Sequence, residues 1–137
     1  MSDKKISVGI VGTGWMGEQL LKRVHEHPDA AVGAVFDMKE ENAKAAMTRH
    51  GVDPSLYVPR YEDMLADTSI DAVVLVSPNA FHAKQSLAAL NAGKHVMSEK
   101  PNAVTWQDHA AIIGAAEKHP SLVTMTDYIF FFDHMVE

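Results

Sequence analysis

At 137 residues, the chain has the length of one ordinary domain and is large enough to bury a hydrophobic core. Its composition, 47% hydrophobic and 22% charged, is typical of a globular protein that works in water. A formal charge of −6 without a basic cluster argues against a nucleic-acid-binding surface. No apolar stretch approaches the length of a membrane span, and the absence of cysteine excludes disulfides and thiol chemistry.

The composition also bears on location and on metals. The first five residues lead directly into an apolar strand broken by glycine, so we expect no signal peptide. A chain without cysteine fits a reducing compartment, and we expect a cytoplasmic protein. The eight histidines show none of the spacings that metal motifs require, so we expect no metal site.

Apolar runs and helical patterns alternate regularly along the chain. Strands are predicted over residues 6–11, 31–37, 57–58, 72–76 and 95–98, with a sixth from residue 122. Helices are predicted over residues 15–25, 40–50, 62–66, 81–91 and 105–118. Such alternation predicts an α/β fold, a doubly wound parallel sheet of the Rossmann type, with strand order 3-2-1-4-5-6.

The first predicted turn carries the pattern Gly12-x-Gly14-x-x-Gly17 between a strand and a helix. In a dinucleotide-binding fingerprint, Gly12 permits the tight turn, Gly14 lets the backbone approach a pyrophosphate, and Gly17 lets the helix pack against the strand. The pattern alone also fits an ordinary glycine-rich turn. Asp37 ends the second predicted strand 20 residues after Gly17, the spacing expected of the acid that binds an adenosine ribose. The alternative interpretation of Asp37 is a solvated turn residue. A carboxylate there favours NAD over NADP, and Lys39 softens that preference.

Two further polar segments follow the fourth and fifth predicted strands. Ser77, Pro78 and Asn79 follow one, and Glu99, Lys100 and Pro101 follow the other. Because the carboxyl ends of parallel strands meet at one edge, these segments are predicted to converge with the glycine turn on a single crevice.

The segment from Ser77 to His82 and the run Ala92-Gly93-Lys94-His95-Val96, with Glu-Lys-Pro after it, resemble the Gfo/Idh/MocA family of oxidoreductases. The resemblance extends from Ile6 to about Val123 and implies an NAD(P)-dependent enzyme that moves hydride between a nicotinamide and a hydroxyl carbon of a sugar or polyol. It implies that Lys100 is catalytic and reaches a substrate hydroxyl; otherwise Lys100 would be a solvated loop lysine. The residues implied to contact the cofactor are Gly12, Thr13, Gly14, Trp15, Met16, Gly17, Asp37, Ser77, Pro78, Asn79, His82, Glu99 and Lys100.

The chain departs from this family pattern near its end. The family continues into a second α/β domain that forms most of the substrate pocket, after a glycine-aromatic-x-x-arginine stretch whose arginine is absent here. We therefore expect a dinucleotide-binding domain over residues 1–126 and an aromatic-rich tail over residues 127–137. The tail is predicted to dock on a second copy of the chain, giving a homo-oligomer, or on a separate substrate domain. Two alternatives stay open: an NAD-binding module without catalysis, and a fragment of a longer enzyme.

Overall fold

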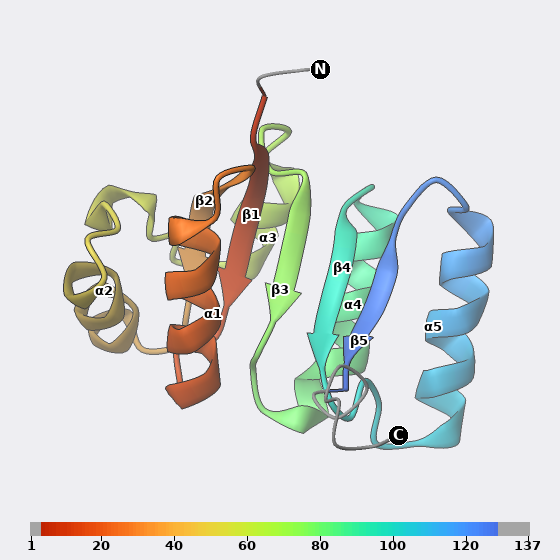
Figure 1. The fold of residues 1–137 in the computed structure, drawn as a ribbon. Coiled ribbons are helices and arrows are strands. Elements are labelled where there is room, and N and C mark those ends of the chain that lie inside the picture. Colours follow the sequence, from red (N-terminus) through yellow and green to blue (C-terminus); the bar gives the residue numbers. More distant parts are fainter. Residues whose placement is uncertain (1–3, 129–137) are drawn as a thin grey trace, which may run out of the picture.

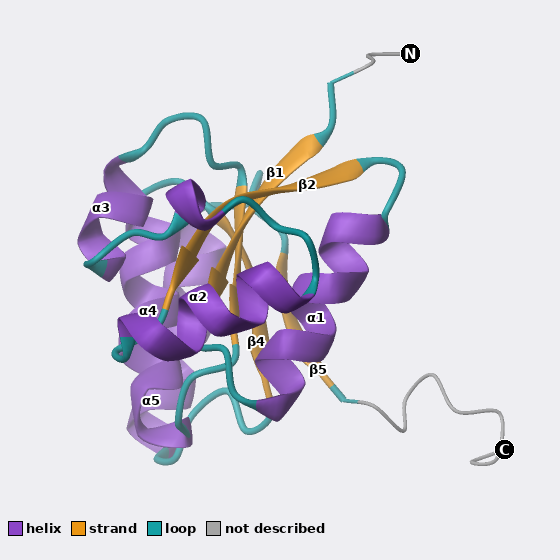
Figure 2. Ribbon diagram, turned by 90° about the vertical axis from the view of Figure 1, so that its left-hand side faces the viewer, coloured by secondary structure: helices purple, strands orange, loops and turns teal. Residues whose placement is uncertain are grey.

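The computed structural model describes residues 4–128, which form a parallel sheet with helices on both faces (Figures 1 and 2). Its five strands in this range are β1 (Ile6–Val11), β2 (Ala30–Phe36), β3 (Ala72–Leu75), β4 (His95–Glu99) and β5 (Thr124–Asp127). They lie in the order β2-β1-β3-β4-β5, and every neighbouring pair is parallel. The predicted Rossmann-type α/β class is confirmed.

The helices divide between the two faces of the sheet. The bounds are α1 (Trp15–Glu26), α2 (Glu40–Arg49), α3 (Tyr61–Ala66), α4 (Asn79–Asn91) and α5 (Trp106–Lys118), with a 3-10 turn at Pro54–Leu56. Helices α1 and α2 cover one core, which includes Ile10, Leu21 and Met47. Helices α3, α4 and α5 cover a second core on the other face, and the side view shows them on the opposite side of the strands from α1 (Figure 2). None of the helices within residues 4–128 is long and apolar enough to cross a bilayer.

The strand predicted at residues 57–58 is reduced to one isolated bridge. Tyr57 pairs with Val35 of β2, and the Val58 N–H donates to the Val35 carbonyl at 2.9 Å. The next residue is Pro59, which has no N–H to continue a ladder. The predicted six-strand order is therefore wrong at this strand. The other five strands lie across the sheet in the predicted order.

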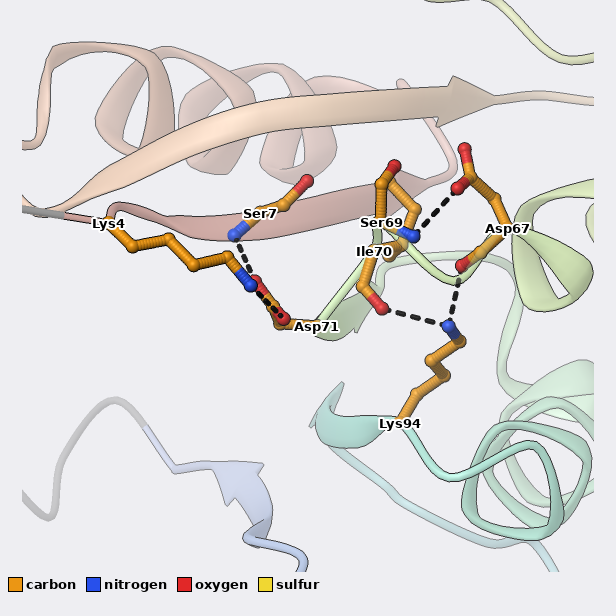
Figure 3. A network of polar contacts seen from close by, with 7 residues as sticks. All are labelled: Lys4, Ser7, Asp67, Ser69, Ile70, Asp71 and Lys94. Carbon is orange, nitrogen blue, oxygen red and sulfur yellow. Dashed lines mark hydrogen bonds and ion pairs between the residues drawn. The ribbon is translucent and has the colours of Figure 1, made fainter.

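A polar network fixes the edge of the sheet where the strands begin (Figure 3). The side chain of Lys94 is buried, and its ammonium donates to the carbonyl oxygens of Asp67 at 2.6 Å and Ile70 at 2.8 Å. Asp71 accepts from the Ser7 N–H at 2.8 Å, and this hydrogen bond is the main reason why the pKa of Asp71 is lowered. The network ties the segment between α3 and β3 to β1 and to the start of β4.

Glu18 of α1 links that helix to the end of α2, because its carboxylate accepts hydrogen bonds from Arg49 and His50. The bond from Arg49, and then that from His50, lowers the pKa of Glu18 below 4.5. A lowered folded-state pKa adds stability that is present above the unfolded value and is lost as the pH falls through the folded value.

Glu18→Gln is expected to lower the free energy of unfolding by about 0.5–1 kcal/mol at neutral pH. The difference from the native chain should shrink as the pH falls below 4.5. Urea unfolding at about pH 7 and about pH 3.5 measures both differences. Glu117→Gln is the control, because Glu117 is an exposed carboxylate on α5, away from α1 and α2. A Glu18→Gln effect that stayed constant with pH would contradict the electrostatic account.

Candidate functional site

The glycine turn between β1 and α1 has the stereochemistry that its pattern predicts. Gly12 has a φ of +94°, and a Cβ there would lie 2.8 Å from the Val76 carbonyl oxygen. A Cβ on Gly17 would lie 2.1 Å from the Gly12 carbonyl oxygen, so only glycine lets α1 approach so closely. A Cβ on Gly14 would meet no atom within 4 Å. The fold thus requires glycine at positions 12 and 17, whereas Gly14 leaves open space beside its backbone.

That open space belongs to a pocket of about 800 Å³ along the edge where the strands end. Gly12 and Gly14 form one side, the end of β2 a second, the start of α3 a third, and the segment from β3 into α4 the fourth. The volume lies within the range of small-molecule sites. The lining residues are Gly12, Gly14, Phe36, Asp37, Met38, Lys39, Asn42, Pro59, Arg60, Tyr61, Glu62, Val76, Ser77, Pro78, Phe81, Lys84, Gln85 and Ala88.

Asp37 forms part of the pocket wall and also holds the glycine turn. One carboxylate oxygen accepts from both the N–H and the hydroxyl of Thr13 at 2.8 Å. The other accepts from the Lys39 N–H at 2.9 Å. Asp37 therefore fixes the turn relative to β2, and its carboxylate lies half-buried beside the pocket.

The predicted site residues separate into two groups. The pocket lining brings together Gly12, Gly14, Asp37, Ser77 and Pro78 from three separate loops. The other predicted residues do not line the pocket: six lie in or beside the same turns, whereas Glu99 and Lys100 lie at the end of β4 and just after it. These other residues are Thr13, Trp15, Met16, Gly17, Asn79, His82, Glu99 and Lys100.

His82 was predicted to contact the cofactor, but it lies behind the residues that line the pocket. Its side chain is 1% exposed, and its ring nitrogens contact two backbone oxygens, those of Ser77 and Pro101. The ring thus joins the loop after β3 to the loop after β4. Its contact with a cofactor stays a prediction.

Glu99 is the last residue of β4 and Lys100 follows it, at the edge of the sheet where the strands end. The Glu99 side chain is buried, and one of its oxygens accepts from the Lys100 N–H at 3.1 Å. Among residues 4–128, the other oxygen, Oε1, is the one buried side-chain polar atom without a hydrogen-bond partner. The Lys100 side chain is exposed and follows this buried carboxylate directly. The Lys100–Pro101 peptide bond is cis.

Several lining residues were not predicted from the sequence, most of them between β2 and α4. Tyr61 donates its hydroxyl to the Gln85 carbonyl at 2.9 Å, and burial raises the pKa of that hydroxyl. Gln85 in turn accepts from the hydroxyl of Ser77. Arg60 and Lys84 add positive charge to the wall. The short strand predicted at residues 57–58 was the available sequence signal, because a segment that pairs with β2 delivers the following residues to the same edge.

Comparison with known proteins gives a family match over nearly the whole described range. Residues 6–127 match the family described as an oxidoreductase family with an NAD-binding Rossmann fold. Inositol 2-dehydrogenase of Salmonella typhimurium is 35% identical over 115 residues, which are 83% of this chain and 34% of that enzyme. Inositol 2-dehydrogenase/D-chiro-inositol 3-dehydrogenase of Halalkalibacterium halodurans is 32% identical over 126 residues, 91% of this chain and 36% of the enzyme.

Solved structures show the same relation. Scyllo-inositol dehydrogenase of Lactobacillus casei with bound NAD(H) and scyllo-inositol has a TM-score of 0.87 and 31% identity; the match covers 96% of this chain and 38% of that one. A 3-ketoreductase of Actinomadura kijaniata in complex with NADP has a TM-score of 0.85 and 27% identity, over 96% of this chain and 41% of the enzyme. This chain thus spans between 34% and 41% of the length of these relatives. On the family match and the shared fold, it belongs to the Gfo/Idh/MocA oxidoreductases and corresponds to their NAD-binding Rossmann domain.

Proposed function

We propose that the chain is the cofactor-binding part of an NAD(P)-dependent oxidoreductase that acts on a hydroxyl carbon of a sugar, a polyol or a related molecule. The observation that carries this proposal is the unobstructed backbone of Gly14 inside an 800 Å³ pocket at the switch between β1 and β3. The relatives support the substrate class, since three of the four described above are named for inositol. A cytoplasmic location stays part of the proposal, in keeping with a chain without cysteine.

The described residues fit a dinucleotide. The first N–H groups of α1, at Trp15 and Met16, have no partner within the helix and lie beside the open position of Gly14, which suits a pyrophosphate. Asp37 would accept from a ribose hydroxyl, and the unpaired Oε1 of Glu99 offers a buried acceptor next to Lys100. When bound, the nicotinamide supplies or accepts the hydride.

The cofactor preference rests on the end of β2. The carboxylate of Asp37 opposes a 2′-phosphate, and so we propose NAD as the preferred cofactor. Lys39 and Arg60 line the same pocket and weaken the discrimination. Of the two structural relatives described above, one binds NAD(H) and the other NADP. Calorimetric titration with both cofactors tests the preference, and tighter binding of NADP would overturn it.

Lys100 is proposed to act on the substrate hydroxyl. Oxidation of a carbinol removes a hydride from carbon and a proton from oxygen, and a cation beside that oxygen stabilises the developing negative charge. Lys100 follows β4 directly and its side chain is exposed, which leaves its ammonium accessible to a substrate hydroxyl.

Lys100→Ala is expected to leave NAD affinity unchanged and to lower the rate of polyol oxidation by about 100- to 10,000-fold. Its matched control is Lys118→Ala, since Lys118 is an exposed lysine at the far end of α5. Calorimetry measures the affinity, and the absorbance of the reduced nicotinamide measures the rate. An unchanged rate in Lys100→Ala would remove this lysine from the reaction.

The surface along β5 supports an association beyond this domain. β5 is an edge strand of the described sheet, and Val123, Met125 and Tyr128 along it are exposed. We propose that this side is covered by a second copy of the chain or by a separate substrate domain. The predicted tail lies outside the described residues from residue 129 onward, and the domain boundary at residue 126 stays a prediction. A clean monomer at micromolar concentration in light scattering would contradict self-association.

The competing proposal is an NAD-binding module without catalysis, favoured by a pocket lining that, within residues 4–128, does not include Lys100. Titration with NAD followed by a turnover screen against sugars and polyols separates the two. Turnover by this chain supports the enzyme, and binding without turnover supports the module. If neither NAD nor NADP binds, both proposals fail.

A further inference from the structure

His82 occupies the first turns of α4 and makes two short contacts in opposite directions. Its Nε2 lies 2.6 Å from the Ser77 carbonyl oxygen, and its Nδ1 lies 2.7 Å from the Pro101 carbonyl oxygen. The ring is 1% exposed, so water does not substitute for either partner. The two oxygens belong to loops that follow different strands of the sheet.

Both partners of the ring are hydrogen-bond acceptors, and this determines what the ring must supply. A neutral imidazole has one N–H donor and one nitrogen lone pair. In either neutral tautomer, one of the two contacts would place a nitrogen lone pair against a carbonyl oxygen at hydrogen-bond distance. Only the imidazolium, with a proton on each nitrogen, turns both contacts into hydrogen bonds.

We propose that His82 is held as the doubly protonated imidazolium and clamps the Ser77–Pro78 loop to the Lys100–Pro101 loop. It is a positioning residue. The first loop lines the pocket, and the second carries Lys100. The assignment of a reaction to these loops rests on the proposed function, but the protonated clamp itself rests only on the two contacts of the ring.

Charged groups near this clamp allow a cation there. Strand β3, which packs against α4, carries no charged residue, whereas β4 ends in Glu99 and is followed by Lys100. The carboxylate of Glu99 is buried with one oxygen unpaired, and the ammonium of Lys100 is on an exposed side chain. The titratable groups on the nearest turns of α4 and α5 are Lys84, Asp108 and His109. The two carbonyl dipoles that face the ring nitrogens stabilise a positive charge on the ring.

The proton count on the ring is measurable without any cofactor. In the chain labelled with ¹⁵N-histidine, long-range proton–nitrogen correlation spectra at about pH 7.5 report each ring nitrogen separately; most free imidazole is neutral there. We expect both nitrogens of His82 at the shift of protonated nitrogen. The exposed ring of His25 is the reference for a solvated histidine in the same spectrum. One protonated and one bare nitrogen on His82 would overturn the proposal.

Hydrogen exchange tests the clamp as a link between loops. In His82→Gln, amides of residues 77–82 and 99–102 are expected to exchange about tenfold faster, as the loss of a charge-assisted hydrogen bond implies. Amides of α2 are expected to keep the native rates, because α2 packs on the other face of the sheet. Unchanged exchange in both loops would overturn the clamp. If the variant does not fold, the spectra of the native chain still decide the protonation, and NAD titration of the native chain remains a separate test of the proposed function.

Discussion

Gly14→Val is expected to weaken NAD binding by about a hundredfold while the domain stays folded. A Cβ at this position meets no atom of the protein within 4 Å, and the φ of −63° is ordinary for any residue. The valine side chain would instead enter the pocket beside the first N–H groups of α1. Loss of two charge-assisted hydrogen bonds to a pyrophosphate, about 3 kcal/mol, corresponds to a loss of affinity of about a hundredfold.

The stability of this variant is the essential control. Replacing glycine at the N-cap of α1 is expected to change the free energy of unfolding by no more than about 1 kcal/mol. Gly114→Val is the matched variant, since Gly114 in α5 is equally open and lies far from the pocket. Calorimetric titration together with urea unfolding measures both properties. Normal NAD affinity in Gly14→Val would mean that the pyrophosphate does not lie at this turn.

Gly17→Ala is expected to have the opposite profile, with loss of the fold itself. Its Cβ would lie 2.1 Å from the Gly12 carbonyl oxygen and 2.9 Å from the carbonyl carbon. Both atoms are backbone, so relief requires α1 to move away from β1, which would open the core around Leu21. We expect a loss of about 3 kcal/mol or more in the free energy of unfolding.

Gly114→Ala isolates the steric effect from helix propensity. Both glycines lie inside helices, but a Cβ on Gly114 meets nothing within 4 Å. Alanine at Gly114 is therefore expected to stabilise the chain by about 0.5–1 kcal/mol, in contrast to alanine at Gly17. Urea unfolding followed by circular dichroism compares the two variants. Equal changes in the free energy of unfolding at the two positions would show that the close approach of α1 to β1 does not determine stability.

The parts of the site that were predictable are those set by short-range sequence. Gly12, Gly14 and Gly17 act through backbone geometry within one turn, and the pattern alone indicated that geometry. The convergence of Asp37 and Ser77 followed from the rule that parallel strands end at one edge. Both inferences need only the order of elements along the chain.

The parts that were not predictable depend on where single side chains point. The spacing of His82 relative to Ser77 did not indicate that the ring turns away from the pocket toward Pro101, 19 residues further along. In the same way, the strand predicted at Tyr57 had apolar neighbours but ended at Pro59, which limits the pairing to one bridge. The wall formed by Arg60 and Gln85 depends on that bridge and on the packing of α4, which no local pattern encodes.

The buried ammonium of Lys94 sits at the opposite rim of the sheet from the pocket, which divides the molecule into a structural end and a ligand-facing end. A destabilising substitution at the structural end would reduce the number of folded molecules without changing how each folded molecule binds its ligand. In a living cell, such a substitution would therefore resemble a loss of activity. Its origin would be a lower concentration of native protein, because quality control removes the unfolded molecules.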